Sequence, residues 1–522
     1  MNDSNLFLTL SLDPSSVSTS YQQLVEQFKT MILKGDLPAG EKVPSSRELA
    51  KSLGSSRTTT IKSYDILISE GFLIAKPKQG VFVAECLPTL QLELSQSSPA
   101  DTDTLVLKSD FEEVKPIQLG AGADVAVFPN KAWASSMRRS WLKPDEKLMH
   151  GHYTSGLPAL KAHLVTYLKD LRGLECEADQ IIITSGNRDA LSILTHALID
   201  QHKVGQQSVW LENPCFPGIS NFFTWLGVNL QSLKIDEEGT VLPNLAEAAP
   251  VFQSKQSHIA LITPNRQYPL GKVMSSSRRQ EWLSQLAISG DSADRKLWLI
   301  EDDYDNEFLY QGRMGVPLMN LDASQSTFFV GSFSKVLFRG IRLGFIVAPK
   351  AKVQDLIASQ VQLGGSASLP MQAVLADFIS TGDFAAHLRR MRRHYLDKRN
   401  YVSSLLNKQL SMYFTYHKPS GGMHTLLYFK PHWIKRHESI LQVKNDTLVK
   451  KLDLYIEQCL QKRHITITSL SSQYFSTDQS TLSESKEIQV EQGFVLGFSQ
   501  SSKETLKMAL EILMQQTRNH FL

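Results

Sequence analysis

The sequence predicts an α/β protein in which a small N-terminal domain of short helices precedes a large C-terminal domain built around a parallel sheet. Three observations lead to this prediction. After residue 116, continuous apolar runs alternate with longer helical patterns, as expected for strands buried on both faces of a parallel sheet. Residues 18–85 instead carry short helical patterns that end in a strand-like tail. The chain of 522 residues is long enough for at least two domains.

Composition restricts the class of protein. A hydrophobic share of 42% and a charged share of 20% exclude collagen-like and wholly disordered chains. No apolar run approaches the ~18–20 residues that span a bilayer, and the first residues lack the basic start of a secretion signal. The four cysteines form no CxxC pair, so we expect no structural zinc and a cytoplasmic protein with reduced thiols. With a net charge of only +3, contacts to nucleic acid need a local basic patch.

The N-terminal block begins with two predicted helices. Apolar residues at helical spacing follow Tyr21, and the pattern stops near Gly35. Ser45 and Glu48 fit a capping box for a short second helix, which ends at Gly54.

A third helix and a hairpin complete the block. Ser55 or Ser56 caps the helix that starts at Arg57, and two helices around a short glycine-containing turn form a helix-turn-helix. In such motifs the start of the second helix meets base edges in the major groove. The strand-like runs 72–74 and 81–83 flank a basic tip, which is a winged arrangement. A capped helical domain without a ligand is the alternative.

The stretch VPSSRELAKSLGSSRTTTIKSYDILISEGFL, followed by QGVFV, resembles the winged helix-turn-helix of the GntR family of bacterial repressors. Arg47, Arg57 and Thr58 match DNA-contact positions of that family, and Gly80 lies at the wing, which departs from the commoner GSGTFV form. The residues expected at DNA are Ser45, Arg47, Ser56, Arg57, Thr58, Thr59 and Gly80. The resemblance therefore implies binding to double-stranded operator DNA.

Residues 86–115 are acidic and rich in Ser, Asp and Thr, with little periodicity. This composition predicts a mobile linker between domains at 18–85 and 116–522. One extended segment packed along the second domain is the alternative.

Lys335 is the leading candidate for chemistry in the second domain. It follows the apolar run TFFV within GSFSK, and a lysine in a small hydroxylated loop at a strand end is well placed to form a Schiff base with an aldehyde cofactor. Ser332 and Ser334 can bond a phosphate, and the guanidinium fork of Arg342 suits one. The spacing of a nucleotide-binding Walker A loop is absent.

The upstream apolar run LWLIEDD ends in carboxylates. Asp302 can hold a pyridinium N–H, and Tyr304, two residues later, projects to the same side toward the phenolic oxygen of the ring. The alternative is a magnesium site made of Glu301, Asp302, Asp303 and Asp305.

Two other strand ends carry candidate residues. Ser185, Gly186 and Asn187 follow the run that starts at Ile181, and their backbone amides at a helix start form an anion site. An ordinary turn is the alternative. Phe216 can stack on a flat ring, with a core position as the alternative.

Together, the stretches HYTSGLPALKAHL, ITSGN, ENPCFPG, TPNRQYPLG, IEDDYDNEF and GSFSKVLFRGIRLG resemble the fold-type I pyridoxal 5′-phosphate enzymes of the aspartate aminotransferase superfamily. The resemblance covers most of residues 116–522 and implies a large parallel-sheet α/β domain with a smaller α+β domain. It implies Lys335 as the Schiff-base lysine. Tyr153 would reach the cofactor phosphate of a neighbouring subunit, which implies a two-fold, head-to-tail homodimer. The implied cofactor-binding residues are Asp302, Tyr304, Phe216, Ser185, Gly186, Asn187, Tyr153, Ser332, Ser334 and Arg342.

A GntR-like reader joined by a linker to an aminotransferase-like domain resembles the MocR/GabR family of transcriptional regulators. The resemblance implies a bacterial cytoplasmic regulator, associated with the nucleoid when bound to its operator, that senses pyridoxal phosphate, an amine or an amino acid through a Schiff base at Lys335. At most, a residual transaminase half-reaction is expected. One alternative is a working aminotransferase that carries a DNA-binding module, and another is a DNA-binding protein whose large domain only dimerises.

Three positions depart from these families, and one of them is Arg339, which precedes Gly340 where Pro is frequent. Arg266 stands where such regulators usually carry His, in TPSHQ. Val495 stands where aminotransferases place an arginine that binds the substrate carboxylate. An effector held by two carboxylate clamps is therefore disfavoured, although Arg266 can supply a substitute cation.

The run from His387 to Arg399 predicts a basic helix. We interpret it as a solvated or domain-spanning helix. Contact with DNA phosphates or docking of the reader is the alternative.

Overall fold

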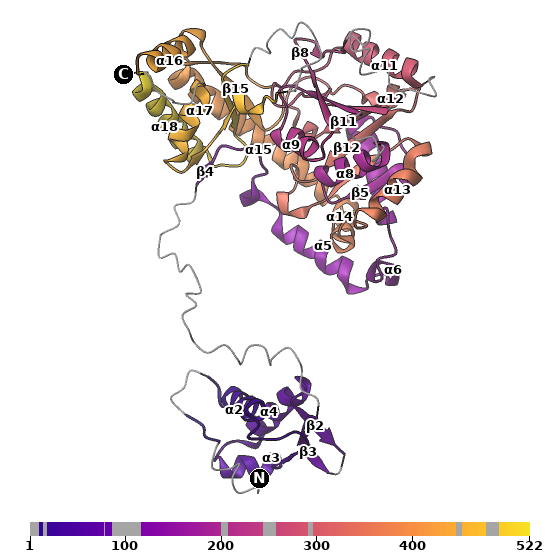
Figure 1. The fold of residues 1–522 in the computed structure, drawn as a ribbon, viewed down its shortest axis with the longest axis vertical. Coiled ribbons are helices and arrows are strands. Elements are labelled where there is room, and N and C mark those ends of the chain that lie inside the picture. The colour runs from indigo at the N-terminus through magenta and orange to yellow at the C-terminus, as the bar shows by residue number, and fades with distance from the viewer. Residues whose placement is uncertain are drawn as a thin grey trace. The chain divides into compact units, whose positions relative to one another are not determined.

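The computed structural model describes residues 10–13, 18–77, 79–85, 116–199, 207–243, 257–290, 296–444, 451–476 and 490–521. The chain divides into two compact units, residues 1–112 and 113–522 (Figure 1). The predicted linker, Lys78 at the wing tip and Cys86 lie outside the described residues.

The first unit is a winged helix-turn-helix. Its helices are α2 (Ser20–Lys34), α3 (Ser46–Ser52) and α4 (Arg57–Ser69). Its antiparallel sheet has the order β1-β3-β2, with β1 at Lys42–Val43, β2 at Leu73–Lys76 and β3 at Gly80–Val83. Phe28, Leu49, Leu67 and Phe72 lie at the centre of the apolar core that joins the helices to the sheet. Burial of this core holds the outer face of α4 in place.

Local capping fixes where the helices of this unit begin. Ser45 accepts a hydrogen bond from the amide of Glu48 at 3.3 Å, and the Glu48 carboxylate accepts one from the amide of Ser45 at 3.0 Å, so the predicted capping box is confirmed. Ser56, rather than Ser55, caps α4 by accepting from the amide of Thr59 at 3.1 Å. The start of α4 is therefore specified by its own sequence.

The second unit is built on a seven-stranded sheet of order β5-β13-β12-β11-β10-β6-β7. The strands are β5 (Ile181–Thr184), β6 (Ser208–Glu212), β7 (Asn229–Leu233), β10 (Ser257–Ile262), β11 (Lys296–Asp303), β12 (Thr327–Ser332) and β13 (Gly344–Val347). Alternate residues enter two different cores: Ile182 packs on one face of the sheet, and Ile181 and Ile183 pack on the other. Both faces are thus buried, as the continuous apolar runs indicate.

One strand departs from the predicted parallel arrangement. β13 pairs antiparallel with both β12 and β5, whereas the other pairings in this sheet are parallel. Only the short connection 333–343 separates β12 from β13, and a parallel return needs a longer crossover. The sequence did not reveal this direction, because a strand buried on both faces has the same apolar pattern in either orientation.

Helices cover both faces of this sheet (Figure 1). α8 and α13 pack on the face that carries Ile182, while α7 and α14 pack on the face that carries Ile183. The helices of this part are α5 (Asn130–Leu142), α6 (Glu146–Met149), α7 (Pro158–Arg172), α8 (Asn187–Leu198), α9 (Pro217–Trp225), α11 (Ser276–Gly290), α12 (Leu318–Leu321), α13 (Val353–Gln362) and α14 (Leu369–Ser380).

A smaller α+β part follows in sequence. Its sheet has the order β14-β15-β18-β17, with strands at Phe414–Tyr416, His424–Phe429, Gly493–Gly497 and Thr468–Ser469. Its helices are α16 (Pro431–Lys444), α17 (Leu452–Gln461) and α18 (Lys503–Phe521). The segment Ile117–Gln118, strand β4, pairs in parallel with β16 (Ile465–Thr466), so the start of the second unit is bound to this smaller part. The predicted combination of a large and a smaller domain is confirmed.

The basic helix lies within α15 (Asp383–Leu405) and is tied to its own unit. Lys398 is 3% exposed and its ammonium donates to Asp124 at 2.6 Å and to the carbonyl of Ser499 at 2.7 Å. Arg399 donates to the carbonyl of Pro419 at 2.9 Å, and Arg392 to that of Glu307 at 3.0 Å. These contacts agree with a helix that connects parts of the unit rather than with a free basic face.

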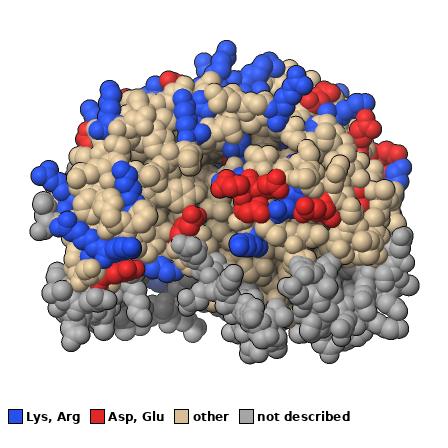
Figure 2. Space-filling view, turned by 90° about the horizontal axis from the view of Figure 1, so that it is seen from above, with Lys and Arg blue, Asp and Glu red and all other residues tan. Residues whose placement is uncertain are grey.

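No helix among the described residues is long and apolar enough to cross a membrane. Figure 2 shows one face of the molecule, on which Lys and Arg side chains are dispersed and Asp and Glu side chains gather near the middle. That face carries both signs of charge, in agreement with the small net charge of the chain.

Candidate functional site

The sheet of the second unit brings the predicted site residues to one edge. β5, β6, β10, β11 and β12 run in the same direction, so their carboxyl ends meet there, and antiparallel β13 starts there. Ligands of open α/β sheets bind at this edge. The predicted residues that the structure places there are Ser185, Gly186, Asn187, Phe216, Asp302, Tyr304, Ser332, Ser334, Lys335 and Arg342.

Lys335 presents a largely buried amine. Its Nζ donates to the carbonyl of Ala121 at 2.5 Å, in the segment that follows β4. Burial lowers the pKa of this amine, and the nearby Asp305 carboxylate opposes the shift. A lowered pKa leaves more of the amine unprotonated, which is the nucleophilic form.

Asp302 lies at the end of β11 without a cationic partner among the described residues. Both of its carboxylate oxygens accept from the side-chain amide of Asn187, at 3.0 and 2.9 Å. Burial raises the pKa of Asp302 to about 7, although the hydrogen bond from Asn187 opposes the shift. A cation placed beside this carboxylate would restore its usual ionisation.

A chain of aromatic rings leads away from Tyr304. Its hydroxyl is buried and has no hydrogen-bond partner among the described residues. The ring of Tyr268 lies 5.8 Å from that of Tyr304, 6.0 Å from that of Phe216 and 5.4 Å from that of His424. Phe216 is 53% exposed, so it is not a core residue, and its ring is free to stack on a ligand.

The predicted phosphate-binding residues lie on three adjacent strand ends. In the strand register Ser332 faces Gly344, and Gly344 faces Thr184, which precedes Ser185. The Ser332 hydroxyl donates to that of Ser334 at 3.1 Å. A Cβ at Gly344 would lie 3.0 Å from the Cα of Gly186, so the absence of side chains lets these strands approach closely.

Arg342 adopts a left-handed backbone conformation with a φ of 50°. This conformation is uncommon for a residue other than glycine, and such strain gathers at functional sites. The side chain is exposed and has no carboxylate partner among the described residues. Its guanidinium is therefore available to an anion.

The acidic residues around β11 point to separate partners instead of to one cation. Glu301 accepts from the amide of Met319 at 3.2 Å, and Asp303 is paired with the buried guanidinium of Arg172. Asp305 is paired with Arg266. Within the described ranges no group of three or more His, Cys, Asp or Glu side chains is arranged to hold a metal ion. The magnesium alternative therefore has no support there.

Arg266 forms a buried ion pair. Its Nε lies 3.2 Å from Asp305 Oδ1, and the two side chains are 4% and 2% exposed. The pair lies against Gly421 and Gly422, where an added Cβ would come within 3.2 Å of atoms of Arg266. The positive charge of Arg266 is thus already compensated, which weakens its predicted role as a substitute clamp.

Tyr153 lies away from this group of residues within its own chain. Its hydroxyl donates to Asp145, which caps the short helix α6. No described contact joins Tyr153 to Lys335.

In the first unit, the predicted DNA-contact residues gather around the starts of α3 and α4. Arg47, Arg57 and Thr58 are exposed, while Ser45 and Ser56 are the helix caps. Thr59 shares a hydrogen bond with Ser56 at 2.8 Å. Gly80 opens β3 with a φ of 117°, and a Cβ there would lie 2.8 Å from the side chain of Lys42. Lys42 is a basic neighbour of the wing that the sequence analysis did not select.

Sequence reasoning also missed Tyr268, Ala121 and His424, and it considered Asp305 only as part of the magnesium alternative. These residues come from different parts of the chain, and none belongs to a motif that by itself indicates its chemical role. One available signal was the pair Gly421–Gly422, which is separated by Met423 from a strand that opens with the polar residue His424, since paired glycines often mark a close approach.

Comparison with known proteins identifies both units. Residues 20–83 match the family described as bacterial regulatory proteins, gntR family, and residues 118–482 match aminotransferase class I and II. The probable rhizopine catabolism regulatory protein MocR of Rhizobium meliloti is 32% identical over 80% of this chain and 84% of its own length. The pyridoxine biosynthesis transcriptional regulator PdxR of Corynebacterium glutamicum is 27% identical over 96% of this chain and 97% of its own length.

Solved structures are similar to the second unit in fold. An archaeal alanine:glyoxylate aminotransferase aligns with a TM-score of 0.62 at 22% identity and covers 78% of this chain and 92% of its own. Kynurenine aminotransferase of Pyrococcus horikoshii aligns with a TM-score of 0.64 at 19% identity and covers 79% and 93%. The second unit therefore has the fold-type I aminotransferase fold.

Proposed function

We propose that this chain, which belongs to the MocR family of transcriptional regulators and carries an aminotransferase class I and II domain, senses its effector through a Schiff base at Lys335. It is a DNA-binding regulator of the MocR/PdxR type, and its cofactor is pyridoxal 5′-phosphate. The effector is pyridoxal phosphate itself, an amine or an amino acid. We assign the reader to residues 18–85, the linker to 86–115 and the sensor to 116–522, in a cytoplasmic protein that is on the nucleoid when bound to DNA.

The residues at the sheet edge fit this cofactor. The observation that carries the assignment is the buried Tyr304 hydroxyl, which lacks a partner among the described residues, on the segment that also carries Asp302. The cofactor supplies an aldehyde carbon that an amine can attack, a phenolic oxygen, a ring nitrogen and a phosphate. Lys335, Tyr304 and Asp302 would hold the first three.

The remaining proposed residues hold the phosphate and the ring. Gly186 and Asn187 offer backbone amides at the start of α8, whereas the amide of Ser185 already donates to Asp189 at 2.7 Å. Arg342 offers an exposed guanidinium. Asn187 orients Asp302 through its side-chain amide. The proposed phosphate and ring contacts are Ser185, Gly186, Asn187, Ser332, Ser334, Arg342, Phe216 and, from a second subunit, Tyr153.

A spectrum tests the Schiff base. Protein purified with pyridoxal phosphate is expected to show a visible absorption band that Lys335→Ala abolishes. Borohydride treatment followed by peptide mapping is expected to find the pyridoxyl adduct on Lys335. A wild-type protein without the band contradicts the assignment. Complete single-turnover conversion of the band by amino acids would instead favour the alternative of a working aminotransferase.

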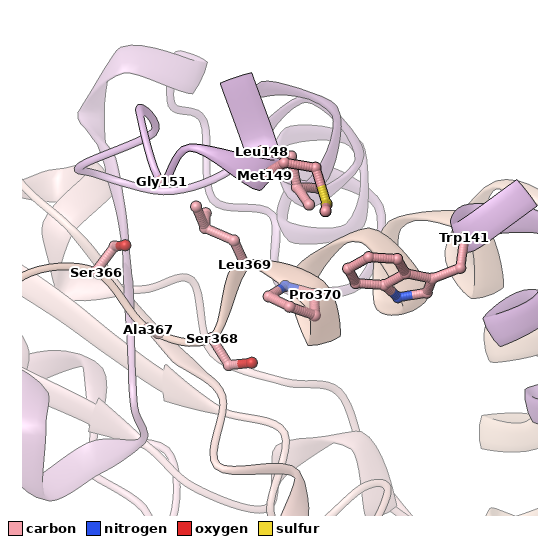
Figure 3. A pocket seen from close by; sticks show the side chains of 9 residues that line it. All are labelled: Trp141, Leu148, Met149, Gly151, Ser366, Ala367, Ser368, Leu369 and Pro370. Carbon is pink, nitrogen blue, oxygen red and sulfur yellow. The ribbon is translucent and has the colours of Figure 1, made fainter. Parts of the chain in front are cut away.

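An exposed apolar surface supports a homodimer. Trp141, Leu142 and Met149 are 39%, 72% and 60% exposed, which is unusual for such large apolar side chains. Trp141 and Met149 border a groove of about 400 Å³ together with Leu369 and Pro370 (Figure 3). Gly151, two residues before Tyr153, lines the same groove. A second copy seated there would bring Tyr153 close to the partner's site.

Sedimentation tests the dimer. The wild-type protein is expected to sediment as a dimer at micromolar concentration, and Trp141→Glu is expected to dissociate because it buries a charge in an apolar contact. Glu175→Gln, a surface change away from the groove, serves as the control. A monomeric wild-type protein that still holds the cofactor would contradict the proposal.

A further inference from the structure

His424 is a buried hydrogen-bond acceptor that nothing in the described chain satisfies. It is 5% exposed, and its Nε2 lies 2.9 Å from the carbonyl oxygen of Pro269. A carbonyl only accepts, so Nε2 carries the hydrogen and Nδ1 carries the lone pair. Burial lowers the pKa of His424 to about 4, so the ring is neutral near pH 7. Nδ1 has no partner, and a buried acceptor of this kind has a cost unless a ligand satisfies it.

The position of His424 associates it with the cofactor site. Its ring packs edge-on against Tyr268 at 5.4 Å, and Tyr268 packs in the same way against Tyr304 at 5.8 Å. The charges of Arg266 and Lys335 lie close enough to His424 to lower its pKa further. His424 is therefore a neighbour of the lysine that would meet an effector amine.

The wall beside His424 is apolar. His424 and Leu426 project to the same face of β15, and in the register with β18 Leu426 faces Val495. Leu426, Leu470 and Val495 form one buried cluster, against which Leu270 packs. The residue opposite His424 is Gly497, which has no side chain. The position that would hold a carboxylate clamp is thus lined with hydrocarbon.

The nearest arginine is already engaged. Asp305 lies 3.2 Å from Arg266, and both side chains lie against the Gly421–Gly422 backbone. A second carboxylate at Arg266 would place two like charges in a buried volume with one cation, which is unfavourable.

From these contacts we infer that the site takes an amine whose tail is uncharged and carries a hydroxyl or amide hydrogen that is donated to His424 Nδ1. Amino alcohols are the simplest members of this class. The inference rests on the proposed function, because the amine is taken to meet the cofactor at Lys335. It adds that His424 determines specificity and that an α-carboxylate is excluded.

Matched ligands test the class. The holoprotein is titrated with three trios that differ only in the tail group: ethanolamine, ethylamine and glycine; alaninol, isopropylamine and alanine; leucinol, 1,3-dimethylbutylamine and leucine. The readouts are the change in the visible band and the shift in Tm. In at least one trio the amino alcohol is expected to bind about tenfold more tightly than the plain amine, because one hydrogen bond is gained at an unsatisfied acceptor. The amino acid is expected to bind more weakly than the alcohol.

Variants assign the preference to His424. His424→Phe keeps the aromatic contact with Tyr268 but removes the acceptor, so the alcohol and the plain amine are expected to bind equally. His424→Gln supplies an amide oxygen and is expected to keep part of the preference. His196→Phe changes a histidine that bonds Ser359 between α8 and α13, and it is expected to leave the preference unchanged. All three are expected to keep the visible band.

The outcomes separate this inference from the proposed function. If the band is present but the amino acids bind best, if the members of every trio bind alike, if no amine binds, or if His424→Phe keeps the preference, the inference is wrong while the cofactor assignment stands. If the wild-type protein shows no band at all, the proposed function itself fails.

Discussion

The proposed functional side chains are exposed in the reader, whereas their polar groups are buried in the sensor. On the reader, Arg57 and Thr58 lie at the surface of a helix whose backbone is already capped by Ser56. In the sensor, the Lys335 amine and the Tyr304 hydroxyl are buried, and the hydroxyl has no hydrogen-bond partner among the described residues. The reader therefore loses little stability when its functional side chains change, whereas the sensor carries an energetic cost that only a bound molecule removes.

One substitution made in both units offers the strongest test of this contrast. Arg172 is 5% exposed and pairs with both Asp303 and Glu307, so Arg172→Met leaves two buried carboxylates without a cation. The sensor is expected to lose about 3–5 kcal/mol of stability, measured as a fall in the Tm of its unfolding transition. Arg57→Met, in the reader, is expected to change the Tm by an amount equivalent to less than about 0.5 kcal/mol. Equal effects would contradict the contrast.

The carboxyl group of Asp302 is expected to make the stability of the cofactor-free sensor depend on pH. Burial raises its pKa from 3.8 to about 7, so between these values the folded state binds more protons than the unfolded state. The contribution of this group to stability is thus expected to fall as pH rises from about 4 to 7, by at most about 4 kcal/mol, and then to level off.

This pH effect is measured as the Tm of the cofactor-free protein against pH. Asp302→Asn, which cannot ionise, is expected to show a shallower decline over the same range, and saturation with pyridoxal phosphate is expected to reduce the decline of the wild-type protein. Parallel curves for wild type and Asp302→Asn would show that ionisation of this carboxyl group does not cause the fall in stability with pH.

Loss of a side chain that is proposed to read bases is expected to affect DNA affinity rather than stability. Arg57→Ala is expected to weaken binding to a duplex selected from a random-sequence library by about 1–3 kcal/mol, or roughly five- to 150-fold. Gel-shift titration measures the effect. Asp36→Asn, which changes an exposed charge outside α3 and α4, is the control. Unchanged affinity of Arg57→Ala would show that another element reads the bases.

The smallest expected effect concerns a cap. Ser45→Ala removes one hydrogen bond to the amide of Glu48 and is expected to destabilise the reader by about 1 kcal/mol. Thermal unfolding of the reader transition measures this loss. Ser69→Ala, at the exposed end of α4, should change the Tm by less than half as much.

The same contrast explains what the sequence could and could not predict. The capping box of Ser45 and Glu48 and the cap of α4 depend on residues that are close in the chain, so the spacing alone predicted them. The position of Asp302 and Lys335 at the sheet edge was predictable because each lies at the carboxyl end of a strongly apolar run. The partners of these residues were not, since the carbonyl of Ala121 reaches Lys335 from 214 positions away. The antiparallel direction of β13 and the pairing of Arg266 with Asp305 likewise depend on tertiary structure that a pattern of residue types does not encode.

The hydrogen bond from Lys335 to Ala121 has a mechanical consequence. Ala121 belongs to the first segment of the sensor after the linker. Two hydrogen bonds hold this segment: Lys335 donates to the carbonyl of Ala121, and the Ser499 hydroxyl donates to the carbonyl of Gly122 at 2.6 Å. Any group that bonds to the Lys335 nitrogen competes with its hydrogen bond to the Ala121 carbonyl. The nitrogen of Lys335 that is proposed to bond the cofactor therefore also holds the segment by which the chain enters the sensor.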